Sequence, residues 1–425
     1  MISQNTLQEY LNAINIPLHN GVIPFWLERS WDNEYGGFLT DFNSQGQVLP
    51  NPEKYLNTQA RLVWWFSTLS RRYPERSEFS ELALKGIDFM IQHFWDNDYE
   101  GWYWKVERDG TLIDDGKVLY GQVFAIYALS EYAMATGEER SSALAHRTFD
   151  LLQKYCADTR YGGYYENLER DWTVAPGGFY AGDRKGLDSH MHTMEAFTVL
   201  YAASKQEIHR RKLAEVVDII VDHMLDPQTG SGRNQFDLAF NPIPAISIHR
   251  TWNAEREGES PEIPIDSTSY GHNIELAWLL TRACEVANID EKAYRRVRHR
   301  LVEHAYTHGV DWEFGGIYRD GIASGDAIIL EKEFWQNAEA LVGFLDAYEV
   351  FGEQRFFEAF ENIWQFVDQQ MINHEVGEWR TLLTREGQPI DDKIGNVWKV
   401  AYHSGRSLLE CATRLERLVK LGSMK

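Results

Sequence analysis

The chain has 425 residues, of which 44% are hydrophobic and 25% are charged, and its formal net charge is -22 at pH 7. This composition is typical of a soluble globular protein with a large core. The negative charge argues against nucleic acid or an anionic membrane as a partner, because either would be repelled over most of the surface. A neutral ligand meets no such barrier.

The cysteines and the N-terminus indicate a cytoplasmic protein. Cys156, Cys284 and Cys411 lie far apart without a CxxC pair, which predicts buried, reduced thiols rather than disulfides or a zinc site. Residues 1–10 lack the basic start and apolar run of a signal peptide. No later stretch is long enough to span a bilayer, so we expect a cytoplasmic location and no membrane partner.

From the start of the chain, a turn motif recurs. Clear copies read WDNEYGGF at 31–38, WDNDYEGW at 95–102 and CADTRYGGY at 156–164. Looser copies occupy residues 225–230, 310–316 and 372–379. Successive copies lie roughly 60 to 85 residues apart, enough for two helices and their connections. Six copies predict six helical hairpins.

Between the turns, the hydrophobic periodicity is helical. Strongly apolar helices are predicted at 56–69, 118–132, 190–203, 270–286, 334–351 and 400–418. All but the last are followed by a more charged helix, predicted at 81–94, 143–155, 211–224, 292–306 and 353–369. An apolar set that alternates with a more solvated set predicts an inner and an outer ring of helices.

Short strand pairs are expected to close the turns. In residues 101–112, alternating residues flank Asp109-Gly110, which is a hairpin signal. The chain is therefore predicted to be all-α, a single (α/α)6-barrel domain spanning 1–425 with short β-hairpins in the connecting turns. The ends of the inner helices on one face would then converge on a single pocket.

One connection, from residue 226 to residue 269, is unusually long and rich in Pro, Gly, Asn and Ser. Connections of this length in compact domains tend to be functional lids or disordered insertions. Because this one leads directly into His272, we favour a lid over the pocket.

Two histidines at helix starts are candidates for proton transfer. His403 follows Tyr402 and stands near Trp398 and Arg406, which combines a group that titrates near neutral pH with an aromatic wall and positive charge. His272 precedes Glu275 by three residues, so a helix would place both on one face. Each histidine could equally cap or brace its own helix.

A metal site is suggested by His190 and His192 with the following Glu195, since imidazole and carboxylate are common zinc or manganese ligands. On a helix, however, residues i and i+2 point roughly 200° apart, so both can reach one ion only in extended backbone. No metal is therefore predicted.

Other inner-helix residues also point to a polar ligand. Arg61 is a charged residue in an otherwise apolar helix, so it pairs with a core carboxylate or lines the pocket. Trp335 could stack on a ligand, and Glu339 adds an inner carboxylate. The chain also holds 15 Trp and 21 Tyr, whose flat amphipathic rings commonly wall sugar pockets.

These segments together resemble the N-acylglucosamine 2-epimerase superfamily, most closely its cellobiose 2-epimerase and mannose 2-epimerase branch. The likeness runs from about Trp26 to the end. It is carried by Ala60-Arg61, 120–131, His190-Met-His192, Glu195-Ala196, 269–275, 336–344 and 398–406. The resemblance implies an (α/α)6 barrel, no metal or other cofactor, and inversion of C2 in a free aldose. We expect a monomer or homodimer.

The resemblance also implies roles for individual residues. His403 and His272 would be the two acid/base groups, Glu275 the partner of His272, and Arg61 the group that holds the oxygens that gain negative charge. Those that would bind the sugar are Tyr120, Asp188, His192, Trp335 and Trp398.

The chemistry accounts for these roles. Once the sugar ring opens, removal of the C2 proton gives an enediolate whose charge must be stabilised where it develops. Inversion returns the proton to the opposite face, which requires two bases. If the proton returned to C1 instead, the product would be a ketose.

Departures from the family pattern point to the substrate. Cellobiose 2-epimerases usually carry Asn-Thr-His-Leu-His where this chain has Asp188-Ser-His-Met-His192, and Trp-Trp where it has Phe334-Trp335. The connection before His272 is also longer than in those enzymes, and Asp188 adds a carboxylate. Both differences would crowd the space for a second sugar. We therefore expect interconversion of D-mannose and D-glucose.

Four alternatives remain open. Within the superfamily they are cellobiose 2-epimerase and mannose–fructose isomerase. From other classes they are a non-catalytic sugar-binding barrel and an inverting glycoside hydrolase, for which Glu275 and Glu339 would be the carboxylates.

Overall fold

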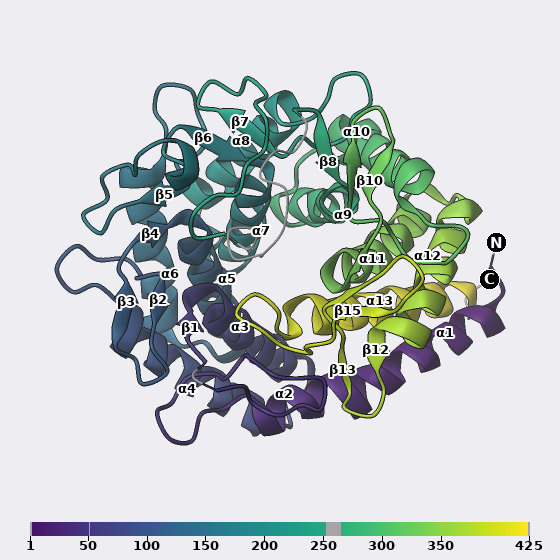
Figure 1. The fold of residues 1–425 in the computed structure, drawn as a ribbon, viewed down its shortest axis with the longest axis horizontal. Helices are drawn as coiled ribbons and strands as arrows, with labels where there is room; N and C mark the ends of the chain where they lie inside the picture. The colour runs from purple at the N-terminus through teal and green to yellow at the C-terminus, as the bar shows by residue number, and fades with distance from the viewer. Residues whose placement is uncertain (1, 51, 252–264, 424–425) are drawn as a thin grey trace.

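The structure, a computed structural model, describes residues 2–50, 52–251 and 265–423. In this part of the chain, two concentric rings of helices surround a common axis (Figure 1). The inner helices are α3 (Leu56–Arg72), α5 (Leu119–Thr136), α7 (Leu187–Ser204), α9 (Tyr270–Ala287), α11 (Phe334–Phe351) and α13 (Ala401–Ser423). Each inner helix packs against the next, and α13 packs against α3, so the inner ring closes.

The outer ring covers the inner one. Its helices are α1 (Gln4–Pro17), α4 (Ser77–Phe94), α6 (Glu139–Leu151), α8 (Glu207–His223), α10 (Glu291–His304) and α12 (Gln354–Phe366). Helix α5 is buried continuously from Gly121 to Tyr132, whereas α12 buries one face that includes Phe356, Phe360 and Ile363. This contrast is the physical basis of the two predicted rings. The predicted (α/α)6 barrel is confirmed.

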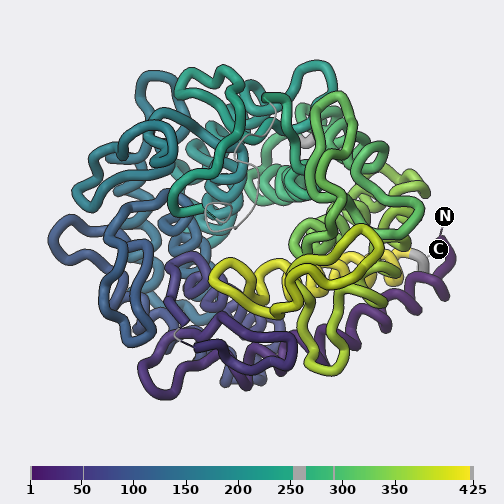
Figure 2. The backbone as a smooth tube through the Cα atoms, in the orientation of Figure 1, coloured from purple at the N-terminus to yellow at the C-terminus, as the bar shows by residue number. Residues whose placement is uncertain are grey.

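The prediction missed the partner of the last inner helix. Helix α1, at the start of the chain, packs against α13, and Figure 2 shows the purple and yellow ends side by side. A short helix α2 (Ile23–Arg29) follows. Four outer helices continue into one π-helical turn, namely η1 (Leu18–Val22), η2 (Leu152–Cys156), η4 (Ala305–Gly309) and η5 (Val367–Met371).

Short antiparallel strands close the connections, as predicted. They are β1 (Lys54–Tyr55), β2 (Lys105–Val106), β3 (Leu112–Asp114), β4 (Lys117–Val118), β5 (Asn167–Leu168), β6 (Arg184–Gly186), β7 (Gln235–Asp237), β8 (Ser267–Ser269), β9 (Asp320–Ile322), β10 (Ala327–Ile329), β11 (Lys332–Glu333), β12 (Ile372–Asn373), β13 (Glu378–Trp379), β14 (Leu382–Leu383) and β15 (Pro389–Asp391). A 3-10 turn, η3, spans Gly178–Tyr180. The predicted hairpin around Asp109-Gly110 is β2–β3, and Gly110 supplies the positive φ of 91° that its turn requires.

The recurring turn motif is a β-bridged loop built on a buried side chain. In the first copy Trp31 pairs with Phe38, and Asp32 Oδ1 accepts from the backbone N–H of Glu34 and Tyr35. The same arrangement recurs on Asp96, Asp158, Asp226 and Asp311. The sixth turn is the pair β12–β13, where Asn373 takes the aspartate's place. All six predicted turns are therefore present.

Buried lysines hold most of these turns to the inner ring. Two residues before α5, Lys117 Nζ lies 3.0 Å from Asp96 Oδ2, and both side chains are fully buried. Equivalent pairs are Lys54–Asp32, Lys185–Asp158, Lys332–Asp311 and, with a glutamate, Lys399–Glu378. A buried charge without its partner is strongly destabilising, so these pairs lock the turns in place.

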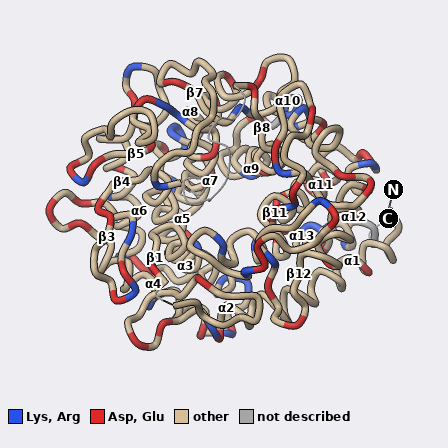
Figure 3. The backbone as a smooth tube through the Cα atoms, in the orientation of Figure 1, with Lys and Arg blue, Asp and Glu red and all other residues tan. Residues whose placement is uncertain are grey.

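The charge distribution agrees with the sequence analysis. Acidic residues are spread over the loops around the whole ring (Figure 3). All three cysteines are buried, as predicted. Within the described residues, every helix is too short or too polar to cross a membrane.

Candidate active site

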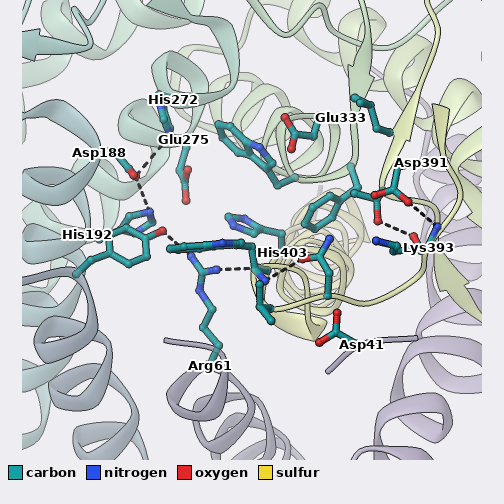
Figure 4. A pocket seen from close by; sticks show the side chains of 18 residues that line it. Asp41, Arg61, Asp188, His192, His272, Glu275, Glu333, Asp391, Lys393 and His403 are labelled. Carbon is teal, nitrogen blue, oxygen red and sulfur yellow. Dashed lines mark hydrogen bonds and ion pairs between the residues drawn. The ribbon is translucent and has the colours of Figure 1, made fainter. Parts of the chain in front are cut away.

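A cavity of about 430 Å³ lies where the N-terminal ends of the inner helices converge. All nine predicted site residues line it, together with loop residues that the prediction did not include (Figure 4). The nine are Arg61, Tyr120, Asp188, His192, His272, Glu275, Trp335, Trp398 and His403. The barrel thus brings into one pocket residues that are more than 300 positions apart in the chain.

The helical repeat explains why these side chains meet. The sixth residue of an inner helix lies at the same level of the barrel in every repeat, and most of these residues are polar. They are Arg61, Phe124, His192, Glu275, Glu339 and Arg406. Five of these six positions carry groups that can hold charge, so the barrel has a polar centre within an apolar shell.

His403, on α13, is oriented by a carboxylate. Its Nδ1 lies 2.7 Å from Glu339 Oε1, and 6% of the residue is exposed. An imidazole that donates through Nδ1 keeps its lone pair on Nε2, which suits it as a base. Burial, reinforced by the charges of Arg61 and Arg406, holds the pKa of His403 well below its ordinary value.

His272, in the first turn of α9, contacts a different carboxylate from the predicted one. Its Nε2 lies 3.5 Å from Asp188 Oδ1. Glu275 Oε1 instead accepts from Arg406 Nη2 at 2.6 Å, so the predicted pairing of Glu275 with His272 is replaced by a bond across the barrel. Burial lowers the pKa of His272, and the charge of Asp188 opposes this shift.

One indole lies against both histidines. The ring centroid of Trp335 is 4.7 Å from that of His272 and 5.8 Å from that of His403. Both imidazoles therefore belong to the same cavity, which is the arrangement that a two-base reaction requires.

His192 is held between two carboxylates. Its Nε2 lies 3.1 Å from Asp188 Oδ1, and its Nδ1 lies 2.9 Å from Glu195 Oε2. Burial alone would lower the pKa of His192, but these bonds outweigh it and raise the pKa to about 9. At neutral pH this imidazole is a fixed cation that donates through both nitrogens.

Arg61 crosses the floor of the cavity. Its Nη2 donates to Tyr120 Oη at 2.7 Å and its Nη1 to the Trp398 carbonyl at 3.1 Å. The guanidinium carbon also lies 4.5 Å from the ring centre of Tyr402. Among the described residues its Nε is buried and has no hydrogen-bond partner. The positive charge of the guanidinium suits an oxygen that gains negative charge.

The sequence analysis did not identify the network beneath the cavity. Arg406 donates to Glu195, Glu275 and Glu339, and all four side chains are buried. Tyr402 Oη also donates to Glu195 Oε2 at 2.5 Å. One sequence feature could have predicted this network: a polar residue at the same position in most of the apolar inner helices. This pattern is visible only when the helices are aligned with one another, not in the separate motifs.

A metal ion does not fit this cluster. Glu275, Glu339 and His403 place ligand atoms within 4.8 Å of one another, the described group that most resembles a metal site. Arg406 Nη2, however, donates to both carboxylates, so a permanent cation already binds their facing oxygens. A metal ion there would have to displace this guanidinium.

The histidine pair on α7 separates as the helical geometry predicts. His190 Nε2 accepts from the Tyr164 N–H at 3.1 Å, and its Nδ1 lies 2.9 Å from the Gly186 carbonyl. Gln59, Gln122, Asn273 and Asn337 hold the equivalent turns at the same helix position. His190 is therefore structural, and of the pair only His192 lines the cavity.

The geometry also argues against an inverting glycoside hydrolase. Such enzymes need carboxylates about 6.5–9.5 Å apart to admit a water molecule. The facing oxygens of Glu275 and Glu339 lie within 4.8 Å and share Arg406 as donor. These two carboxylates leave no place for that water.

Loops supply the remaining wall of the cavity. Asp41, Thr381, Leu382, Asp391, Lys393, Asn396 and Val397 contribute to it, and no motif in the sequence singled them out. They belong to the connections between helices, with Leu382 in β14 and Asp391 in β15, and the course of such connections depends on tertiary packing rather than on local pattern.

Part of the predicted lid is described. Arg250 donates through Nε and Nη2 to both oxygens of Asp114, at 2.9 and 2.6 Å. Arg250 and Thr251 border a small recess beside Asp188 and Trp398. Residues 252–264 of the predicted lid lie outside the described residues.

Known proteins share this architecture over nearly their whole length. The N-acylglucosamine 2-epimerase family model matches residues 36–406. The cellobiose 2-epimerase of Bacteroides fragilis is 29% identical over 397 residues, covering 92% of this chain and 95% of its own. The D-mannose isomerase of Marinomonas mediterranea is 23% identical over 381 residues, covering 87% and 89%.

The fold comparison agrees. The structure of cellobiose 2-epimerase from Bacillus thermoamylovorans B4167 superposes with a TM-score of 0.85 at 25% identity, covering 96% of this chain and 100% of its own. These relatives are carbohydrate epimerases and isomerases, so the chain is an enzyme that acts on sugars. The chain belongs to the N-acylglucosamine 2-epimerase family.

Proposed function

We propose that the protein is a sugar 2-epimerase that interconverts D-mannose and D-glucose without a cofactor. The observation that carries the proposal is the pair of imidazoles, His272 and His403, that lie against one indole in one cavity. A two-base inversion needs two proton carriers around one carbon, and this pair lines one cavity.

The proposed reaction begins with the open-chain aldose. One imidazole removes the C2 proton, and Arg61 stabilises the enediolate oxygens that become negative. The other imidazole returns a proton to the opposite face of C2. Atoms and charge balance within the pair, because one imidazole gains the proton that the other loses.

The loop beside Asp188 and Trp398 supports a monosaccharide substrate. Arg250, fixed to Asp114, and Thr251 border the small recess that adjoins the cavity at Asp188 and Trp398. A guanidinium held by two hydrogen bonds is a rigid wall, so this side favours a single sugar ring.

Cellobiose is the second candidate substrate, and two observations favour it. The Bacteroides fragilis relative bears the name cellobiose 2-epimerase. The cavity also extends toward Asp41, Asp391 and Lys393, beyond the histidines, where a second sugar would find polar partners.

One experiment tests the proposal. The purified protein is incubated with D-mannose in heavy water, and separately with cellobiose, and products are followed by NMR. Formation of D-glucose with deuterium at C2 is the expected result. Fructose as the main product would identify an isomerase, and faster conversion of cellobiose than of mannose would overturn the proposed substrate.

A further inference from the structure

A single carboxylate oxygen contacts two histidines of the cavity. Asp188 Oδ1 lies 3.1 Å from His192 Nε2 and 3.5 Å from His272 Nε2, and Figure 4 shows Asp188 between the two rings. Asp188 and His192 are one turn apart on α7, whereas His272 comes from α9. The side chains of His192 and His272 are 2% and 11% exposed and that of Asp188 is 27% exposed, so water reaches the carboxylate from one side but hardly reaches the rings.

His192 keeps this carboxylate ionised. Glu195 Oε2 binds the Nδ1 of His192 from the other side, so both ring nitrogens donate and the ring is cationic. Burial opposes ionisation of Asp188, but the hydrogen bond from His192 and the charges of His272 and Arg61 lower its pKa to about 2. The carboxylate is therefore negative throughout the neutral pH range.

The two imidazoles of the proposed reaction stand in different electrostatic surroundings. His403 faces three cations, Arg61, Arg406 and the His192 ring, which repel a proton, and two carboxylates, Glu195 and Glu339, which attract one. His272 faces Asp188 and the His192 cation from α7, and Glu333 and Glu339 from the β11–α11 segment. Asp188 contributes the largest of these charge effects on His272, and it favours the protonated ring.

We propose that Asp188 is a positioning residue that keeps the shared proton on His272 between turnovers, so that His272 begins as the acid and His403 as the base. This inference rests on the proposed function, because it assigns starting roles within a two-base reaction. Asp188 acts through His272, and the hydrogen bond from His192 keeps the Asp188 carboxylate negative.

The consequence concerns the pH range of activity. A reaction that needs one proton on two imidazoles gives a bell-shaped profile of kcat/KM, whose alkaline limb reports loss of that proton. Removing the charge of Asp188 lowers the proton affinity of His272. The alkaline limb then moves to lower pH.

Asp188→Asn tests this, because the amide keeps the shape of the side chain and removes its charge. We expect the alkaline limb of kcat/KM for D-mannose to move down by about one pH unit or more, the scale of a neighbouring charge at this distance. Asp391→Asn is the matched control, since it removes a carboxylate from another wall of the same cavity. Its alkaline limb should stay in place.

A second measurement needs neither turnover nor the Asn variant. NMR titration of the histidine Cε1–H signals in the unmodified protein, assigned with His272→Gln and His403→Gln, gives the proton affinities of both rings. His272 should take its proton at higher pH than His403. The reverse order, or an alkaline limb unmoved in a folded Asp188→Asn variant, overturns the inference.

The two experiments separate the possible failures. An unmodified protein that does not epimerise D-mannose refutes the proposed function, whereas the same NMR titration, repeated on Asp188→Asn, still tests the role of Asp188. An epimerase whose His272 signal and alkaline limb ignore the Asn substitution refutes the inference alone.

Discussion

Glu339 offers the sharpest test of how the buried network controls catalysis. Its Oε1 accepts from His403 Nδ1 at 2.7 Å and from Arg406 Nη2 at 2.8 Å. Its Oε2 accepts from Trp278 Nε1 at 3.0 Å. All three partners donate, so only a group that accepts through both oxygens satisfies them. Glu339→Gln places an amide N–H₂ against one of these donors.

The cost has two parts. A buried donor left without an acceptor destabilises the fold by about 1–3 kcal/mol. If the amide turns its N–H₂ toward His403, the imidazole must carry its proton on Nε2 and loses its lone pair there. Loss of an orienting partner costs about 10–100-fold in activity, and a wrong histidine tautomer costs about 10⁴-fold. We expect kcat to fall by about 10² to 10⁴.

The assay is the rate of D-mannose epimerisation at neutral pH, together with unfolding in denaturant. Glu378→Gln is the matched control. Glu378 is buried and accepts from Trp26 Nε1, Lys399 Nζ and Ser404 Oγ, but it contacts no imidazole.

Glu378→Gln should lose at least as much stability, because it leaves Lys399 buried without its carboxylate, and should keep its kcat within about tenfold of the unmodified protein. Equal losses of kcat in both variants would refute the reasoning, because they would trace the effect to stability and not to the orientation of His403.

Further predictions follow from the same contacts. His190→Gln should retain activity and lose less than about 1 kcal/mol of stability, because glutamine can accept the same backbone N–H. The prediction would be contradicted if elemental analysis found a metal bound to the unmodified protein and the variant lost its activity. Arg250→Ala should raise kcat/KM for cellobiose relative to D-mannose by removing the wall tied to Asp114, and an unchanged ratio would show that the wall does not select the substrate. The pKa of both Asp188 and Glu195 is lowered to about 2, below that of an unfolded carboxyl. Their stabilising effect is therefore complete above about pH 5 and is lost as the pH falls towards 2, so the free energy of unfolding should decrease between pH 5 and pH 3. Denaturant titrations that show a constant value over this range would contradict the assigned ionisation.

Much of the fold could be predicted from the sequence because the chain repeats one unit, a turn followed by two helices. The turn aspartates and the alternation of apolar and polar helices are local patterns, and each predicted element recurs in the structure. The outer helix that packs against α13 could not be predicted from the repeat. Helix α1 precedes the first copy of the turn, so nothing in the repeat assigned it to the last hairpin.

The candidate site was predictable to the extent that its residues occur in recognisable segments. All nine predicted residues line the cavity, yet the pairing of His272 with Glu275 was inferred from spacing on one helix. Contacts between helices decided otherwise, because Arg406 reaches Glu275 from across the barrel and Asp188 reaches His272 from α7. Spacing along a sequence defines a shared face, but not which neighbour occupies it.

The contact between the first and last helices has a consequence for biosynthesis. Because Gln4–Pro17 packs on Ala401–Ser423, the ring cannot close before residues 401–423 have been synthesised. His403 and Arg406 both lie on that final helix, so the nascent polypeptide has neither the second base nor the cation that its buried glutamates require. The cavity therefore acquires all of its residues only when the last helix closes the inner ring.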